Sequence, residues 1–412
     1  MATQASPILD VRADFPILAR EIEGKRIVYL DSAASAQKPE AVLDAMDRFY
    51  RTSYANVHRG VYTLAQEATE LFEGARLRIA AFVGGEGQTT IFTRNGTEGL
   101  NLVARAWGKD NVGHGDAVLV TEMEHHSNLV PWQMLCHDVG AQLRYLEVDD
   151  DGRISLDQLD AELARGDVKV VAFAHVSNVL GTINPVAEIA ARARAAGALS
   201  VVDGCQGVPQ LPVDIPLLGA DFYAWTGHKA LGPTAVGVLH GRAEILTEMG
   251  PWLGGGHMIS RVDRDSSEWT ELPWKFEAGT DVIAEAIGLG AAVDYLDALG
   301  MERVRSHERE LTARALEGLR AIDGVTVVGP PGVEDRGGVI SFAIEGMHPH
   351  DVADLLNRDN VCVRAGHHCA QVLMRKLGVA ATARASFGPY NVAEDVDALL
   401  ESVARARDVF RV

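Results

Sequence analysis

Residues 221–229 read DFYAWTGHK, an apolar run that ends in a small, polar turn carrying one lysine. The apolar part is typical of a buried strand. Lys229 follows it directly, after Thr226, Gly227 and His228. A lysine in this setting suits covalent catalysis, in which its amine forms a Schiff base with an aldehyde. A surface lysine in a loop is the alternative, and this stretch alone does not exclude it.

A second apolar run ends in an acidic residue. Residues 201–206 read VVDGCQ, so Asp203 stands about one strand–helix–strand unit before Lys229. A carboxylate beside a pyridine nitrogen keeps that nitrogen protonated, which strengthens pyridoxal 5'-phosphate as an electron sink. An aspartate that merely caps a helix is the alternative for Asp203. The pairing with Lys229 favours a site for pyridoxal 5'-phosphate.

The middle of the chain alternates apolar, strand-like runs with helical patterns. Nearly continuous apolar strands separated by helices predict an α/β fold with a mostly parallel sheet covered on both faces. Ligands of such sheets bind beyond the carboxyl ends of the strands, where the polar motifs of this chain lie. The expected strands are residues 89–93, 117–121, 143–146, 168–175, 199–202, 221–225 and 236–239. The expected helices are residues 39–53, 66–83, 96–107, 126–139, 154–165 and 185–196.

The pattern changes after about residue 290. Helical stretches at 282–298 and 302–323 lead to expected strands at 325–328, 339–344, 361–364 and 384–387, and a helix at 394–410 closes the chain. We therefore expect an N-terminal arm (1–20), a large domain (21–290) and a smaller C-terminal α/β domain (291–412). The arm is expected to fold back onto the small domain.

Composition narrows the class of protein. The chain has 412 residues, 47% of them hydrophobic, and a formal net charge of -19, which argues against nucleic acid as a partner. No apolar stretch is long enough to span a bilayer, and residues 1–20 do not resemble a secretory signal. Four cysteines without CxxC spacing indicate a reducing compartment, so we expect a cytoplasmic protein.

Two further motifs follow strands of the expected sheet. Residues 94–99 read RNGTEG at a strand-to-helix junction, where free backbone N–H groups and a Thr hydroxyl form an anion site, although an ordinary helix cap fits equally well. Residues 121–128 read TEMEHHSN, and His125 can lie flat on an aromatic cofactor. A helix cap is again the alternative. No third ligand stands at zinc-like spacing from the two histidines, so no metal site is expected.

The C-terminal part carries a cysteine in a polar loop. Residues 364–370 read RAGHHCA, and Arg364 with the histidines is expected to lower the pKa of the Cys369 thiol. A zinc site is the competing interpretation, but one cysteine and two adjacent histidines do not complete a tetrahedron. Arg384, at the start of an expected strand, can hold a carboxylate with its planar fork.

Together these stretches resemble the fold-type-I pyridoxal-phosphate enzymes, and among them the Suf-type cysteine desulfurases. The resemblance runs from residue 29 to the closing helix. It rests on the motifs YLDSAASAQKP, NVHRG, TEMEHHSNLVPWQ, HVSNVLGT, DFYAWTGHK, FEAGT and VRAGHHCAQ. The short RAGHHCA segment lacks the longer mobile cysteine loop of the other main branch of desulfurases. Cys205 departs from the family, which usually has alanine there.

The resemblance implies a role for each matching residue. Lys229 binds the cofactor and later moves the Cα proton, Cys369 is the sulfur nucleophile, and His125 stacks on the ring and acts as an acid. The remaining cofactor contacts are Gly96, Thr97, Asp203, Gln206, Thr226 and His228, with Thr280 supplied by a second subunit of a homodimer. Asn178, Arg364 and Arg384 are expected at the substrate, L-cysteine. His350 is expected to dock a zinc-bearing sulfur acceptor.

The implied reaction converts L-cysteine to L-alanine and leaves a persulfide that supplies sulfur for iron–sulfur cluster assembly. A selenocysteine lyase or an aminotransferase that uses the same cofactor is the first alternative, and Cys369 argues against a plain aminotransferase. A non-catalytic scaffold that carries sulfur or an iron–sulfur cluster is the second. Four scattered cysteines supply a four-thiolate cluster poorly, and bound cofactor would colour the protein yellow.

Overall fold

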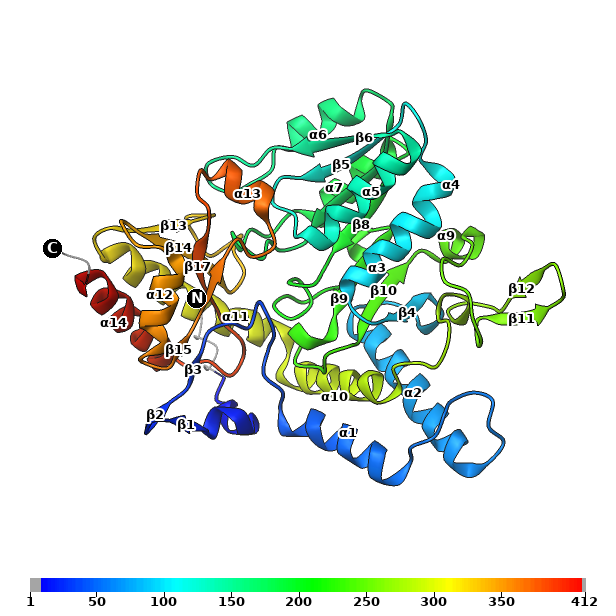
Figure 1. Cartoon of the computed structure of the whole chain (residues 1–412), viewed down its shortest axis with the longest axis horizontal. Coiled ribbons are helices and arrows are strands. Elements are labelled where there is room, and N and C mark those ends of the chain that lie inside the picture. The colour runs from blue at the N-terminus through cyan, green and yellow to red at the C-terminus, as the bar shows by residue number, and fades with distance from the viewer. Residues whose placement is uncertain (1–8, 410–412) are drawn as a thin grey trace, which may run out of the picture.

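The computed structural model describes residues 9–409, which form two main sheets with helices around them and three two-stranded pairs (Figure 1). The larger sheet has seven strands in the order β4-β10-β9-β8-β7-β5-β6. Its strands are β4 (Thr90–Thr93), β5 (Ala117–Thr121), β6 (Gln142–Leu146), β7 (Val168–Ala174), β8 (Leu199–Asp203), β9 (Phe222–Thr226) and β10 (Gly237–Gly241). Six of the seven strands run in one direction and β10 alone runs in the opposite one, which confirms the predicted mostly parallel sheet.

Both faces of this sheet are buried, and the strand sequences show why. In β5, Leu119 packs into one hydrophobic cluster while Val118 and Val120 pack into the cluster on the other face. Because side chains alternate between faces, a strand buried on both sides must be apolar throughout. This is the origin of the continuous apolar runs in the sequence.

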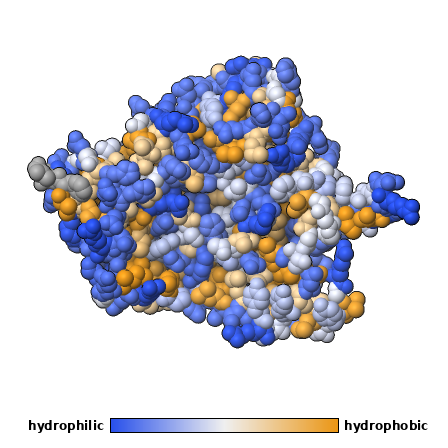
Figure 2. Space-filling model, viewed as in Figure 1, coloured by the Kyte–Doolittle hydropathy of each residue, from blue (hydrophilic) through white to orange (hydrophobic). Residues whose placement is uncertain are grey.

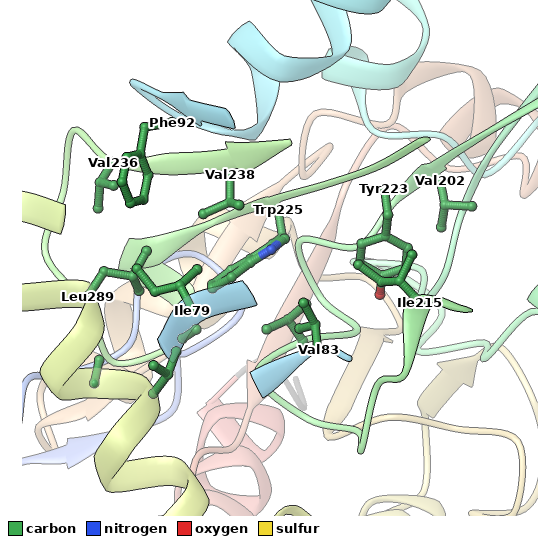
Figure 3. Packing of buried hydrophobic residues seen from close by; sticks show 14 of the residues in the cluster. Ile79, Val83, Phe92, Val202, Ile215, Tyr223, Trp225, Val236, Val238 and Leu289 are labelled. Carbon is green, nitrogen blue, oxygen red and sulfur yellow. The ribbon is translucent and has the colours of Figure 1, made fainter. Parts of the chain in front are cut away.

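Two layers of helices cover the larger sheet. These helices come from the chain before its first strand, between its strands and after its last strand. Figure 3 shows Trp225 and Val238 of the sheet packed with Ile79 of α2 and Leu289 of α10. The helices of this part are α1 (Glu40–Thr52), α2 (Thr63–Phe82), α3 (Gly96–Leu102), α4 (Lys109–Asn111), α5 (Val130–Val139), α6 (Leu156–Leu163), α7 (Val186–Ala195), α8 (Ile215–Leu218), α9 (Ala243–Glu248) and α10 (Ile283–Leu299). A π-helical turn (Val103–Gly108) joins α3 to α4.

The smaller sheet has four antiparallel strands in the order β13-β14-β17-β16. Its strands are β13 (Val325–Val328), β14 (Val339–Ile344), β16 (Arg364–Gly366) and β17 (Thr382–Ser386). The helices of this part are α11 (Met301–Ala321), α12 (Pro349–Asn357), α13 (Gln371–Lys376) and α14 (Ala393–Val409). Apolar residues of α11, α12 and α14 form one cluster with β14 and β17.

One prediction about the chain path is wrong. The expected single strand at 361–364 is two strands, because β15 (Val361–Cys362) pairs with β3 (Val28–Tyr29) while β16 pairs with β17. Val28 and Leu30, beside this pairing, also pack in the hydrophobic cluster of the smaller sheet. The predicted domain division stays a proposal.

The arm predicted at residues 1–20 is described only from residue 9, and residues 1–8 lie outside the described part. Short 3-10 turns (Arg12–Asp14 and Pro16–Ala19) lead to a small hairpin of β1 (Glu21–Ile22) and β2 (Lys25–Arg26). Phe15 is buried, with its ring centroid 4.8 Å from that of Tyr390, and Arg12 pairs with Asp395 of α14 at 3.2 Å. The described part of the arm therefore contacts the C-terminal region.

A hairpin of β11 (Ile259–Val262) and β12 (Ser267–Trp269) was not predicted and projects from the right of Figure 1. Its side chains are mostly exposed, so it lacks the buried apolar face on which strand prediction relies. Among residues 9–409, no helix is long and apolar enough to cross a membrane.

Candidate active site

A cavity of about 190 Å³ opens beyond the carboxyl ends of β5, β7, β8 and β9, where loops of the two sheets meet. It brings together most of the residues predicted from the sequence. The predicted residues that line it are Gly96, Thr97, His125, Asn178, Asp203, Gln206, Thr226, His228, Lys229, Arg364, Cys369 and Arg384. Thr280 and His350 are not among the lining residues, and both were assigned to contacts with a second protein chain.

Lys229 and Asp203 are placed by neighbouring parallel strands. Asp203 is the last residue of β8 and is 6% exposed, and Lys229 ends the 3-10 turn (Gly227–Lys229) that follows β9. The Oδ1 atom of Asp203 accepts a hydrogen bond from the backbone N–H of Cys205 at 3.0 Å, which orients the carboxylate at the cavity wall. Parallel pairing of β8 with β9 puts both residues at one edge of the sheet.

The hydrogen bonds of His125 determine its tautomer. Its Nδ1 atom accepts from the backbone N–H of Ser127 at 3.1 Å and lies 2.9 Å from the Ser127 hydroxyl. Burial, with the positive charge of Lys229, lowers the pKa of His125 to about 4. The ring is therefore neutral at neutral pH with its proton on Nε2, so it can donate a hydrogen bond into the cavity.

The lining residues fit pyridoxal 5'-phosphate. The buried hydroxyl of Thr226 has no hydrogen-bond partner, as expected for a group that awaits an acceptor such as a phosphate oxygen. Gly96 opens α3 beside it, and a Cβ there would lie 2.6 Å from the Cys205 sulfur. Glycine is required for this close approach. This cofactor binds its phosphate at a helix N-terminus and hydroxyl groups, its ring nitrogen at an aspartate and its aldehyde at a lysine. The cavity offers all of these groups.

The cysteine loop reaches the cavity from the smaller sheet. His368 and Cys369 both have positive φ angles, of 52° and 56°, so the chain turns sharply here. The backbone oxygen of Cys369 accepts from the His126 N–H at 2.7 Å, and the oxygen of His368 accepts from Asn178 Nδ2 at 2.7 Å. These bonds hold the thiol of Cys369 at the cavity although its loop belongs to another sheet.

One prediction about the electrostatics of this loop is wrong. His368 was expected to stand as a positive partner of the thiol, but burial lowers its pKa to about 3. Its Nε2 atom points at Thr382, with the hydroxyl at 2.9 Å and the carbonyl oxygen at 3.1 Å. A neutral ring facing the sheet supplies no positive charge to Cys369. The predicted partners that are left are Arg364, which is exposed and lines the cavity, and His367, which is also exposed.

Arg384 is almost fully buried and already partnered. Its Nη2 atom lies 3.1 Å from Asp31 Oδ1, and its Nη1 donates to the backbone oxygen of Asn178 at 3.0 Å. The Nε atom has no partner. A substrate carboxylate can therefore bind Arg384 through its free N–H or by replacing Asp31, whose own pKa burial raises.

Some site residues were missed from the sequence. Ser127 lines the cavity, sets the His125 tautomer and has its hydroxyl 2.6 Å from that of Thr97. Asp31 faces Arg384. Glu124, next to His125 in the chain, is buried and accepts hydrogen bonds from Thr121, Asn128 and the Ala174 backbone, and burial raises its pKa to about 8. Each of these residues lies in a motif that the sequence showed. Only the folded structure shows whether such a residue caps a helix or takes part in the cavity.

Comparison with known proteins places this site in a family. The Aminotransferase class-V family matches residues 28–399. A cysteine desulfurase of Haloferax volcanii is 48% identical over the full length of both chains, and one of Escherichia coli O127:H6 is 47% identical, covering 96% of this chain and 97% of its own.

Solved structures agree with this assignment. An apo cysteine desulfurase of Thermococcus onnurineus NA1 has a TM-score of 0.94 at 39% identity, covering 99% of this chain and 100% of its own. The Escherichia coli cysteine desulfurase CsdA, in an S-sulfonic acid form, has a TM-score of 0.89 at 39% identity, covering 97% and 98%. The chain thus belongs to the class-V aminotransferase family, and its predicted fold-type-I architecture and its cofactor, pyridoxal 5'-phosphate, are confirmed.

Proposed function

We propose that the protein is a cysteine desulfurase that converts L-cysteine to L-alanine and leaves the sulfur on Cys369 as a persulfide. The observation that carries this proposal is that Lys229 and Cys369 line one cavity, although they come from different sheets. The relatives named cysteine desulfurase, which match almost all of the chain, support it.

The residues divide the reaction between them. When bound, the cofactor supplies an electron sink for the pair left by the Cα proton. The Nζ atom of Lys229 removes that proton, and Asp203 holds the ring nitrogen protonated. His125 is neutral with its proton on Nε2, and its Nε2–H donates a hydrogen bond to the reacting groups.

Sulfur transfer then falls to Cys369. Its thiolate attacks the sulfur of the substrate, so a sulfur–sulfur bond forms while the bond from sulfur to Cβ breaks. The carbon keeps that electron pair and takes up a proton, which gives alanine and needs no external oxidant. Arg384 and Asn178 hold the substrate carboxylate, and Arg364 stabilises the thiolate.

Substrate comparison tests this proposal against its alternatives. The purified protein is incubated with L-cysteine, with L-selenocysteine, and with alanine plus a 2-oxo acid, and alanine or the new amino acid is measured. A desulfurase forms alanine from L-cysteine, a dedicated selenocysteine lyase forms it only from L-selenocysteine, and an aminotransferase reacts only in the third mixture.

Replacing Asp203 tests the electron sink. Asp203→Asn is expected to bind the cofactor and to slow alanine formation about a hundredfold, since a neutral amide no longer stabilises the protonated ring nitrogen. The rate is measured under single-turnover conditions, and bound cofactor is measured by absorbance. An unchanged rate at full cofactor occupancy would mean that Asp203 only orients the Cys205 backbone.

We further propose a Suf-type enzyme that supplies sulfur for iron–sulfur cluster assembly in the cytoplasm. The short RAGHHCA segment supports this branch, and the four cysteines, all free thiols, fit a reducing compartment. The solved structure of CsdA matches 97% of this chain at 39% identity, so overall similarity does not select the Suf branch and the sulfur acceptor decides it.

His350 is the residue through which we propose that a zinc-bearing acceptor docks. It lies in the first turn of α12, exposed, with its ring centroid 5.1 Å from that of His348. The Nδ1 atom of His348 accepts from the His350 backbone at 3.3 Å and so caps the helix. The ring of His350 has no such role and can replace a thiolate in the zinc shell of the acceptor.

His350→Ala is expected to match the wild type when a chemical reductant removes the sulfur and to lose stimulation by the zinc-bearing acceptor. Asp354→Ala, on the same helix, serves as the matched control and should keep the stimulation. Equal stimulation of the wild type and His350→Ala would exclude the docking role.

We also propose a homodimer in which Thr280 of each subunit reaches the cofactor phosphate of the other. Large apolar side chains are exposed around the start of α2, among them Tyr54 at 62%, Val61 at 92% and Tyr62 at 55%. Figure 2 shows apolar residues along the lower edge of the molecule, where Figure 1 places α1 and α2. A partner subunit of the same sequence would cover such a surface.

A further inference from the structure

Three loops that are distant in the sequence bring two histidines and an aspartate together outside the cofactor cavity. His58 precedes α2, His257 precedes β11, and Asp281 precedes α10. Each offers one ligand atom, and these atoms all lie within 4.8 Å of one another. The Nδ1 atom of His257 is 3.2 Å from Asp281 Oδ2, and the Nδ1 atom of His58 is 4.0 Å from the same oxygen.

The tautomer of His58 is set by a carboxylate behind it. Its Nε2 atom lies 2.7 Å from Glu73 Oε1, and Glu73 is held in turn by Arg76 at 2.8 Å and Trp274 at 3.1 Å. Arg76 and Trp274 both donate to this carboxylate, so it is an acceptor and His58 carries its proton on Nε2. The lone pair of Nδ1 therefore faces His257 and Asp281. Histidines that bind metals are oriented by carboxylates in this way.

The facing atoms lack hydrogen bonds. Both His58 Nδ1 and Asp281 Oδ2 are buried and neither makes a hydrogen bond, although Asp281 Oδ2 lies 3.2 Å from His257 Nδ1. Buried polar atoms without hydrogen bonds cost stability. His58 and His257 also have positive φ angles, of 71° and 75°, which are uncommon for residues other than glycine and cluster at functional sites. The loops of His58 and His257 are therefore held in an unfavourable backbone conformation. In this conformation they bring together potential metal-ligand atoms, two of which lack hydrogen bonds.

We infer that His58, His257 and Asp281 form a binding site for a divalent transition metal ion, with zinc as the best fit. Two imidazoles and one carboxylate match the ligands that zinc takes in three-residue sites with an open fourth position. Zinc bonds of about 2.0–2.2 Å place tetrahedral ligand atoms about 3.4 Å apart. The distances from Asp281 Oδ2 to His257 Nδ1, 3.2 Å, and to His58 Nδ1, 4.0 Å, lie on either side of that spacing.

The site would link the loop of Thr280 to two other loops. Asp281 directly follows Thr280, so a bound ion would hold that loop against the segments of His58 and His257. Binding to the folded state alone raises stability in proportion to the logarithm of metal concentration. This site could not be predicted from the sequence, because its ligands lie on separate loops without metal-type spacing.

Equilibrium dialysis with zinc chloride tests the inference. The holoenzyme is used in the Cys369→Ser background, because the thiol near His126 and His367 could hold zinc independently. We expect one zinc ion per chain at this site, and His257→Ala or Asp281→Asn should weaken its affinity at least about a hundredfold. The exposed His114→Ala serves as the matched control and should bind zinc as the parent does.

Two further measurements separate a metal site from general damage. Glu73→Gln, which keeps the shape behind His58, should weaken zinc binding about 10- to 100-fold, with circular dichroism confirming the fold. Zinc should also raise the thermal midpoint of the parent but not of His257→Ala. Equal zinc affinity in the parent, His257→Ala and Asp281→Asn would overturn the inference.

Discussion

Lys229→Ala is expected to lose the yellow absorbance of the lysine-bound cofactor and to form no measurable alanine from L-cysteine. Lys229 is a predicted covalent anchor and proton acceptor, and within the described residues no other lysine lines the cavity. Loss of a positioned acid–base group alone costs about 10²- to 10⁴-fold, and loss of the anchor adds to it. We expect a decrease of about 10⁴-fold or more.

The control is Lys109→Ala, an exposed lysine of α4 far from the cavity lining. It should keep both the absorbance and the rate. Spectra and alanine formation are measured on the same samples, so that loss of cofactor is distinguished from loss of chemistry. Normal turnover by Lys229→Ala would refute the assignment of the whole site.

Cys369→Ser has the second largest expected effect. The variant should keep the cofactor spectrum, because Cys369 comes from the smaller sheet and Lys229 from the larger. Release of sulfur from L-cysteine should fall about a thousandfold or more, equivalent to about 4 kcal/mol of transition-state stabilisation. A serine hydroxyl is not ionised at neutral pH and is a far weaker nucleophile than a thiolate.

Cys362→Ser is the matched control, because this thiol is half-buried in β15 and does not line the cavity. Persulfide in Cys369→Ser would point to Cys205, the other thiol that lines the cavity. Cys205 is a poor nucleophile as it stands, since burial raises the pKa of its thiol well above the usual range.

The sheet could be predicted because its physical signal is local. Strands buried on both faces must be apolar almost throughout, so the residues of β5 and β14 were predicted with their bounds. The polar motifs followed those strands and therefore met at one edge. The hairpin β11–β12 carries no such signal, since its residues face solvent.

Neither the pairing partner of a short strand nor the protonation state of a histidine could be predicted from the sequence. Val28 looks the same whether its strand pairs within the large sheet or with β15, and only the packed structure decides. His368 looked like a positive neighbour of Cys369, but the cost of burying its charge, beside Thr382, makes it neutral. The convergence of His58, His257 and Asp281 also depends on tertiary contacts alone.

The most direct test of the central claim is a single turnover of the wild-type protein with L-cysteine, without reductant. Alanine is quantified, and the peptide that contains Cys369 is analysed by mass spectrometry. A desulfurase gives one alanine for each sulfur atom added, with that sulfur on Cys369. Alanine formed without added sulfur on Cys369, or no alanine from protein with full cofactor, would contradict the proposed function.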